Sequence, residues 1–169
     1  MRNPLIQLGF DIPFDRIEAA HVRPAVDALL ASAREAVDAI AASEAPRTYD
    51  NTLGALEDAT EALELAMTTV GHLESVATTD ELREAYNEAV PKVSAFWSEL
   101  AMNDGLYAAV RAFAETSEAA SLDRTRKRFL EKTLDDFRRH GAELGPEDKA
   151  RLQARDVELT QLTTQFSQH

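Results

Sequence analysis

Residues 21–43 have the sequence HVRPAVDALLASAREAVDAIAAS, in which apolar side chains return every three or four positions. This spacing places them on one face of an α-helix, because the helix completes a turn in about 3.6 residues. Pro24 is compatible with a helix start, since the amides of a first turn have no partner within the helix. The stretch therefore predicts a long amphipathic helix whose apolar face is formed by Val22, Val26, Leu29, Ala33, Val37 and Ile40.

The same spacing of apolar residues recurs along the rest of the chain. It predicts further helices near residues 48–77, 80–100, 106–113, 122–140 and 146–166. No segment alternates polar and apolar residues for long enough to form a strand. We therefore predict an all-α fold, an antiparallel helical bundle of about five to six helices joined by short turns.

Three features of the expected turns and helices can be assigned to particular residues. Thr78 followed by Glu81 has the spacing of a capping box, in which two free amides are satisfied reciprocally. Pro91 lies in the middle of the third predicted helix and should kink it, because its ring removes one backbone hydrogen bond. Gly141 follows the fifth predicted helix and is expected to end it in the left-handed conformation.

The first 14 residues should not form a regular helix, because Pro4, Gly9 and Pro13 interrupt them. They nevertheless contain several large apolar side chains, which are costly to leave in water. We expect an extended N-terminal arm at 1–14 that lies across a helical domain at 15–169. The apolar side chains expected to hold the arm are Leu5, Ile6, Phe10, Ile12 and Phe14.

Composition excludes several classes of function. The chain has 169 residues with 30 acidic and 18 basic side chains, so its formal net charge is −12. That balance argues against nucleic acid as a partner, because phosphate binding needs a concentrated cationic surface. Cysteine is absent from the sequence, which excludes disulfides and thiolate chemistry. No apolar run has the length of a signal-peptide core or a membrane helix, so we predict no membrane partner and a cytoplasmic location.

The histidines do not have the spacing of a metal site. The sequence contains four, His21, His72, His140 and His169, and no two are three or four residues apart. His21 lies at a predicted helix start, where capping or packing is its expected role. His72 and Glu74 are two positions apart and point to different faces of a helix, so a surface or structural role is expected for His72.

Charged residues likewise give no catalytic pattern. The adjacent pairs Asp135-Asp136 and Glu147-Asp148 diverge by about 100° on a helix, whereas paired carboxylate chemistry needs convergence in a cleft. The basic cluster at 124–128 and Arg138-Arg139 are expected to pair with nearby acids such as Glu131 and Asp135. Glycine-rich phosphate loops and G-x-S-x-G elbows do not occur. We therefore predict no catalytic, cofactor-binding or metal-binding residue in this chain.

Several ordered strings in this sequence resemble the N-terminal part of the thimet oligopeptidase/oligopeptidase A family of zinc metallopeptidases. The resemblance extends over nearly all of the chain, and the order and spacing of the strings make it more specific than any one of them. The strings are Asn3-Pro4-Leu5, Phe14 with Ile17, His21-Val22-Arg23-Pro24-Ala25, Thr48-Tyr49-Asp50-Asn51-Thr52, His72-Leu73, Leu82-Arg83-Glu84-Ala85-Tyr86, Gly105-Leu106-Tyr107, Leu134-Asp135-Asp136-Phe137 with Gly141, and Leu159, Leu162 and Phe166-Ser167.

This resemblance implies a parent enzyme that hydrolyses short peptides with one zinc ion. In the family, the zinc is bound by an H-E-x-x-H helix and a further glutamate in the C-terminal half. None of these elements occurs in this sequence, so the resemblance assigns no catalytic or metal residue here and implies that this chain alone is inactive. It implies instead a helical region that forms a wall of a substrate channel, with short peptides and the C-terminal catalytic half as partners.

The C-terminus leaves two interpretations open. The amphipathic pattern of the last predicted helix continues to Phe166, and Ser167-Gln168-His169 contains no stop signal. Either a helix ends at a chain terminus, or the sequence belongs to a longer protein that continues in mid-helix, which is the reading favoured by the resemblance. The alternative function is a stand-alone acidic helical bundle that acts as a protein-binding module. A carboxylate-bridged metal bundle is not expected, because it needs a Glu-x-x-His pair from each of two helices and the sequence contains a single such pair, Glu18 with His21.

Overall fold

The computed structural model describes residues 3–167, except for the side chains of 153, 156, 157, 160, 161 and 164–167 in the last helix. Over this range the protein is all-α and contains no strand, which confirms the predicted fold class. Seven α-helices are present in it, because a short helix, α5, precedes the fifth predicted one. Their bounds are α1 Ala19–Ala42, α2 Ala55–Ala77, α3 Asp80–Ala101, α4 Asp104–Ala114, α5 Ser117–Ser121, α6 Arg124–Arg139 and α7 Pro146–Ser167.

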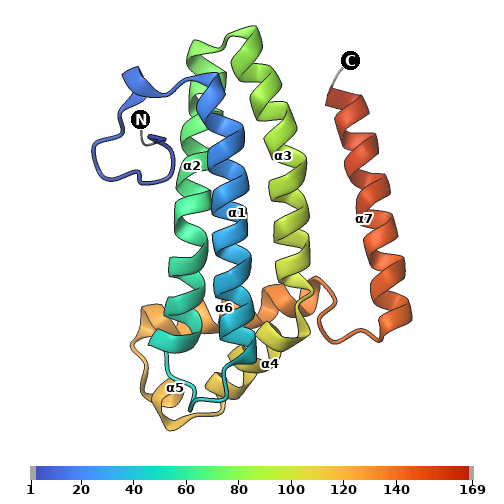
Figure 1. Cartoon of the computed structure of the whole chain (residues 1–169). Helices are drawn as coiled ribbons and strands as arrows, with labels where there is room; N and C mark the ends of the chain where they lie inside the picture. Colours follow the sequence, from blue (N-terminus) through green and yellow to red (C-terminus); the bar gives the residue numbers. More distant parts are fainter. Residues whose placement is uncertain (1–2, 168–169) are drawn as a thin grey trace.

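The three longest of the first helices, α1, α2 and α3, form an upright bundle (Figure 1). Consecutive helices run antiparallel, so α1 and α3 run in the same direction. Three ion pairs join these two helices, and in each the partners are 65 positions apart. The constant offset shows that α1 and α3 lie in register over most of their length. The pairs are Arg23 with Glu88, Asp27 with Lys92, and Arg34 with Glu99.

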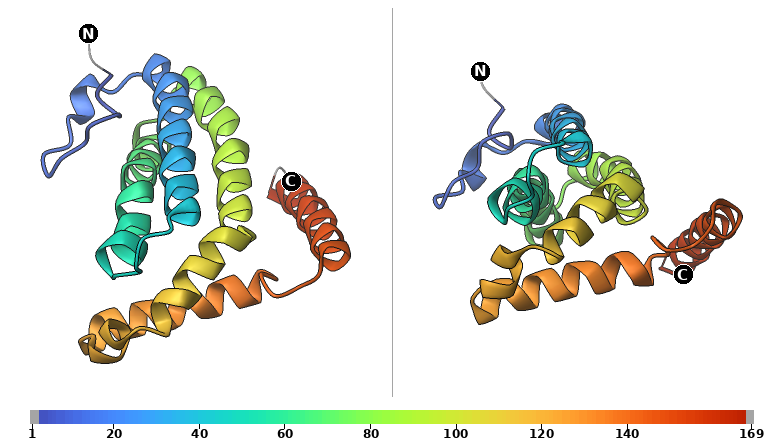
Figure 2. Two further views of the ribbon diagram at one scale, coloured as in Figure 1. Left: turned by 60° about the horizontal axis from the view of Figure 1, so that its bottom comes forward. Right: turned by 90° about the horizontal axis from the view of Figure 1, so that it is seen from below.

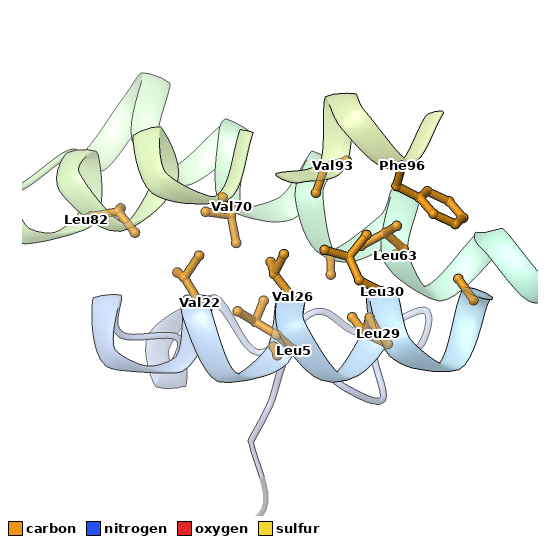
Figure 3. Packing of buried hydrophobic residues seen from close by; sticks show 14 residues of the cluster. Leu5, Val22, Val26, Leu29, Leu30, Leu63, Val70, Leu82, Val93 and Phe96 are labelled. Atoms are coloured by element: carbon orange, nitrogen blue, oxygen red, sulfur yellow. The ribbon is translucent and has the colours of Figure 1, made fainter. Parts of the chain in front are cut away.

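The core of this bundle is the predicted apolar face of α1, which packs along both α2 and α3. Figure 3 shows Val26 of α1 pointing toward Val70 of α2 and Val93 of α3. Val26 and Val70 are almost completely buried, and so are the other large side chains at the centre of the cluster. Burying a side chain of this kind stabilises the fold by about 1.5–3 kcal/mol. α1 therefore acts as the central helix of the bundle.

A second core cluster lies where α4 and α6 cross one end of the bundle (Figure 2). Phe113 of α4 is completely buried and packs edge-on against Tyr49, with the ring centroids 6.4 Å apart. Tyr107, also on α4, contacts Phe137 of α6 with the ring centroids 5.7 Å apart. The contact between Tyr107 and Phe137 fixes α6 across the lower end of α2 and α3.

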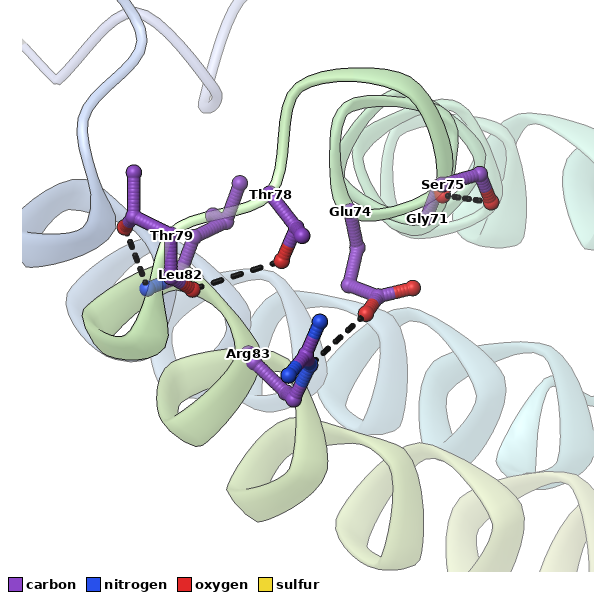
Figure 4. Close-up of polar contacts among 7 residues, drawn as sticks. All are labelled: Gly71, Glu74, Ser75, Thr78, Thr79, Leu82 and Arg83. Carbon is purple, nitrogen blue, oxygen red and sulfur yellow. Dashed lines mark hydrogen bonds and ion pairs between the residues drawn. The ribbon is translucent and has the colours of Figure 1, made fainter.

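The helix starts differ from the prediction at two places. The cap of α3 is Thr79 rather than Thr78: its hydroxyl accepts a hydrogen bond from the backbone N–H of Leu82 at 3.2 Å (Figure 4). The reason is that α3 begins at Asp80, directly after Thr79, so the residue three positions after the cap is Leu82 and not Glu81. Near Glu81, Arg83 forms an ion pair with Glu74 across the turn between α2 and α3.

The second predicted helix begins later than residue 48. Thr48 and Asn51 form a reciprocal cap: the Thr48 N–H donates to Asn51 Oδ1 and the Asn51 N–H donates to Thr48 Oγ1. A π-helical turn at Asp50–Gly54 follows, and α2 begins after it. α3 continues through Pro91, so the helix is not interrupted there.

The N-terminal segment is held by fewer side chains than predicted. Leu5 is buried in the bundle core, and the side chain of Asn3 donates a hydrogen bond to the backbone carbonyl of His21. Phe10 is fully exposed, and the side chains of Ile6 and Phe14 are 37% and 43% exposed. The expectation that all five apolar side chains would hold the segment was therefore wrong for Phe10, because the chain turns away from the helices before it reaches that residue.

Helix α7 stands apart from α1, α2 and α3 (Figures 1 and 2). Lys149 near its start forms an ion pair with Asp104 of α4. Leu159 and Leu162, on the predicted apolar face, are 62% and 57% exposed. The side chain of Phe166, assigned to the same face, lies outside the described residues. Between residues 3 and 167 no helix is long and apolar enough to cross a membrane.

Candidate functional site

A groove lies between α2 and α3 on the side that faces away from α1, with α6 at its lower end. It consists of two hollows of about 470 and 400 Å³, and Trp97 and His140 line both of them. Volumes of this size are typical of sites for small ligands. The groove exists because α1 fills only one side of the α2–α3 pair, while α6 covers only one end of the other side. We call it the Trp97 groove.

Its floor is aromatic. Phe96 and Trp97 are neighbours on α3, and consecutive helical positions diverge by about 100°, so Phe96 points into the core and Trp97 into the groove. Their rings are 5.3 Å apart in an edge-on contact, which positions the half-buried indole. Phe129 and Phe137 of α6 add two further rings. Within the described part of the chain the indole N–H of Trp97 makes no hydrogen bond, and it remains a donor toward the groove.

The rim of the groove is acidic. Glu57, Glu64 and Asp136 line it and are exposed, and none of their carboxylates forms an ion pair with any residue between 3 and 167. The carboxylates that join α1 to α3 are, in contrast, paired with arginine or lysine. Among the described lining residues there is no lysine or arginine. The groove therefore presents uncompensated negative charge next to an apolar floor.

His140 lies at the end of α6, where the two hollows meet. Its Nδ1 is 2.7 Å from the backbone carbonyl oxygen of Asp136. A carbonyl oxygen only accepts, so Nδ1 carries a proton and donates in this contact. Gly141 follows with a φ of 85°, and the Ala142 N–H donates to the Phe137 carbonyl, which completes a Schellman motif. The predicted left-handed end of this helix is confirmed, and it fixes His140 at the groove.

His21 and His72 have the roles expected of them. His21 caps α1, because the backbone N–H of Glu18 donates to its Nδ1 at 3.1 Å. His72 is exposed and contacts the Phe14 ring, with centroids 5.8 Å apart. His169 lies outside the described residues. Among residues 3–167 no group of three or more histidine, aspartate or glutamate side chains is arranged to bind a metal ion.

The basic cluster of α6 is partly paired. Arg138 forms ion pairs with Asp135 and Glu143, as the helical spacing predicted for Asp135. Arg126 contacts Asp123 at 4.0 Å rather than Glu131. Its guanidinium also stacks over the Tyr49 ring, 4.3 Å from the centroid, and this contact draws it toward the second core cluster.

One carboxylate next to the groove-forming helix has a shifted pKa. The hydroxyl of Tyr107 donates a hydrogen bond to Glu143 at 2.6 Å, and this bond, together with the charge of Arg138, lowers the pKa of Glu143. The interaction connects α4 to the turn after α6. It stabilises the position of α6 at the end of the groove rather than creating a reactive group.

The helical spacing of Trp97, Phe129 and Phe137 is typical of core residues, and no feature of the sequence marks His140 as a groove residue. Phe137 is indeed buried, whereas Trp97 and Phe129 are half-buried and line the groove. The one available signal was the adjacency of Phe96 and Trp97, since two neighbouring aromatic residues on a helix cannot both face the same core. The rim carboxylates carried no such signal, because Glu57 and Glu64 lie on α2 whereas Asp136 lies on α6.

Comparisons with known proteins show what the sequence of this chain is similar to. The sequence profile described as "Neurolysin/Thimet oligopeptidase, N-terminal domain" matches residues 26–149. Oligopeptidase A of Salmonella typhimurium and that of Escherichia coli are each 33% identical to the chain, over 99% of it and 25% of their own length. Dipeptidyl carboxypeptidase of Salmonella typhimurium is 31% identical over 98% of the chain and 25% of its own length. The chain thus spans about a quarter of the length of these curated relatives.

Proposed function

Because the chain belongs to the neurolysin/thimet oligopeptidase family and corresponds to its N-terminal domain, we propose that it forms a helical wall of the peptide channel of a zinc-dependent oligopeptidase. In this proposal the substrates are short peptides, and the zinc ion and the residues that activate water belong to a C-terminal catalytic half. The chain itself contributes no catalytic or metal-binding residue. The division into an arm at 1–14 and a helical domain at 15–169 is part of the same proposal.

The observation that carries the proposal is the alignment with two Oligopeptidase A proteins over 99% of the chain. The geometry agrees with a wall: three long helices stand side by side (Figure 1). They expose a groove on the face that α1 does not cover. The exposed Leu159 and Leu162 of α7 also favour contact with further polypeptide over the alternative of a self-contained protein-binding module. We propose a cytoplasmic location for the enzyme.

The proposal can be tested with a chimaera in which this chain replaces the matching quarter of Escherichia coli Oligopeptidase A. We expect the chimaera to hydrolyse a fluorescence-quenched short peptide and to lose that activity when a chelator removes the metal. We expect it to leave intact a folded protein that contains the sequence of the same peptide. The 169-residue chain alone, supplied with zinc, should give no chelator-sensitive turnover. Size-exclusion chromatography and zinc analysis verify that the chimaera is folded and loaded with metal.

Two results would overturn the proposal. The first is chelator-sensitive hydrolysis by the 169-residue chain alone, because this would place a metal site inside it. The second is a folded, zinc-loaded chimaera that hydrolyses folded proteins as readily as short peptides, since the helical wall would then not restrict the substrate.

A further inference from the structure

We propose that the Trp97 groove binds short peptides that carry a positive charge next to an apolar side chain. This inference deepens the proposed function, because it names the class of peptide that this part of the wall selects. It depends on three properties of the groove: an aromatic floor, a free hydrogen-bond donor and an uncompensated acidic rim.

The floor accounts for the apolar side chain. Trp97 and Phe129 are half-buried, so each presents a ring face or edge that is neither fully packed nor fully hydrated. Covering such surface removes apolar area from water, which is favourable. The indole N–H of Trp97, which has no partner between residues 3 and 167, can donate to a backbone carbonyl of an extended peptide. The floor therefore suits a peptide segment better than a purely aliphatic molecule.

The rim accounts for the positive charge. Glu57 and Glu64 lie seven positions apart on α2, which is close to two helical turns, so both face the same side of the groove. Asp136 faces it from α6, and none of the three has an ion-pair partner in the described chain. An ammonium or guanidinium group beside the floor would interact with carboxylates from two helices. An anionic peptide would meet three like charges, and the net charge of −12 would also disfavour its approach.

Other occupants of the groove are less well matched. A second copy of this chain would bring the same acidic surface to the groove, except along the basic face of α6. The apolar side of α7 carries Leu159 and Leu162, but its first turn begins with Glu147 and Asp148, which have the same sign as the rim. A cationic peptide is the occupant for which both shape and charge are complementary.

The single tryptophan of the chain provides a direct test, because its fluorescence reports on the groove alone. The full 169-residue chain is titrated at low salt with a tetrapeptide amide composed of alanine, leucine, lysine and leucine. A second peptide with glutamate in place of lysine, and a third with an acetylated N-terminus, separate the two sources of positive charge. Calorimetry of the same titrations detects binding that leaves the fluorescence unchanged.

The rim is tested with the double variant Glu57→Gln/Glu64→Gln. The matched control is Glu35→Gln/Glu44→Gln, which removes two exposed glutamates away from the groove. We expect the lysine peptide to shift the Trp97 emission saturably, and the rim variant to raise its Kd about fivefold, while the control variant binds as the original chain does. Raising the salt concentration should weaken binding to the original chain more than to the rim variant.

The inference is overturned if the glutamate peptide binds as tightly as the lysine peptide. Equal Kd values for the rim variant and its control overturn it as well. Absence of binding by both methods, or a fluorescence change that accompanies dimer formation in sedimentation, does the same. These outcomes do not involve hydrolysis by the chimaera, so a failed titration leaves the proposed function standing. A chimaera that hydrolyses folded proteins as readily as short peptides, together with a positive titration, removes the proposed function and leaves the groove as a binding site.

Discussion

Replacing Val70 with alanine tests whether the packing of α1 against α2 holds the bundle together. Val70 is completely buried on the α2 face that meets α1. The substitution removes two carbon atoms, which costs about 1.6 kcal/mol at ~0.8 kcal/mol per buried methylene. The unfilled space adds a cavity cost, so we expect the free energy of unfolding to fall by about 2–3 kcal/mol. For a chain of this length that corresponds to a decrease in Tm of about 4–12 °C.

Val76→Ala is a matched control on the same helix, because Val76 is 66% exposed. Both substitutions replace valine by a better helix former, which changes the stability of the helix by up to about 0.7 kcal/mol. The difference between the two variants therefore isolates the contribution of packing. We expect Val76→Ala to leave the stability within about 0.5 kcal/mol of the original chain or to raise it slightly.

Urea unfolding followed by far-ultraviolet circular dichroism measures both variants. The dependence of the unfolding free energy on urea should keep its slope, because the surface exposed on unfolding is nearly unchanged. If Val70→Ala lies within about 0.5 kcal/mol of Val76→Ala, the α1–α2 contact does not stabilise the fold as described.

Three further predictions concern single contacts. Thr79→Ala should cost about 1 kcal/mol in urea unfolding by removing the cap of α3, and Thr78→Ala much less; equal effects would reassign the cap. Gly141→Ala should cost more than about 1 kcal/mol, because φ is positive there and the added methyl group would lie 2.7 Å from Leu144; a variant as stable as the original refutes this. Tyr107→Phe should return the pKa of Glu143 toward its ordinary value. In the original chain, the lowered pKa of Glu143 stabilises the fold at pH values above the ordinary pKa of a glutamate, near 4.3. This stabilisation is lost as the pH falls through the pKa that Glu143 has in the folded state. The stability difference between this variant and the original should therefore be larger at pH 7 than at pH 3, and a difference that widens on acidification would contradict it.

The fold was predictable because the apolar period identifies helix faces directly. The face of α1 was assigned residue by residue, and Val22 through Ile40 on that face are buried as expected. Helix starts were less accessible, because a cap depends on the backbone conformation of one residue: Thr78 and Thr79 have the same side chain, and only Thr79 is positioned over the amides of α3. Phe10 was placed wrongly because apolar character does not determine where an irregular chain turns.

The candidate site was less predictable than the fold. Its rim brings Glu57 and Glu64 of α2 together with Asp136 of α6, residues separated by more than 70 positions in the sequence. No local pattern encodes that α6 crosses the end of α2 and α3, since the crossing depends on aromatic contacts such as that between Tyr107 and Phe137. Family resemblance was the one route from sequence to function, and it assigned no residue to the groove.

The uniform 65-residue offset between α1 and α3 makes the bundle sensitive to changes in chain length. A substitution at Glu88 would break one exposed ion pair, which contributes at most about 1 kcal/mol. One residue inserted in α3 ahead of Glu88 would instead rotate everything downstream by about 100°. All three ionic contacts would then fail together, and Phe96 would leave the interior. Evolution can thus exchange side chains freely along this surface, but it can add or remove residues only in the turns.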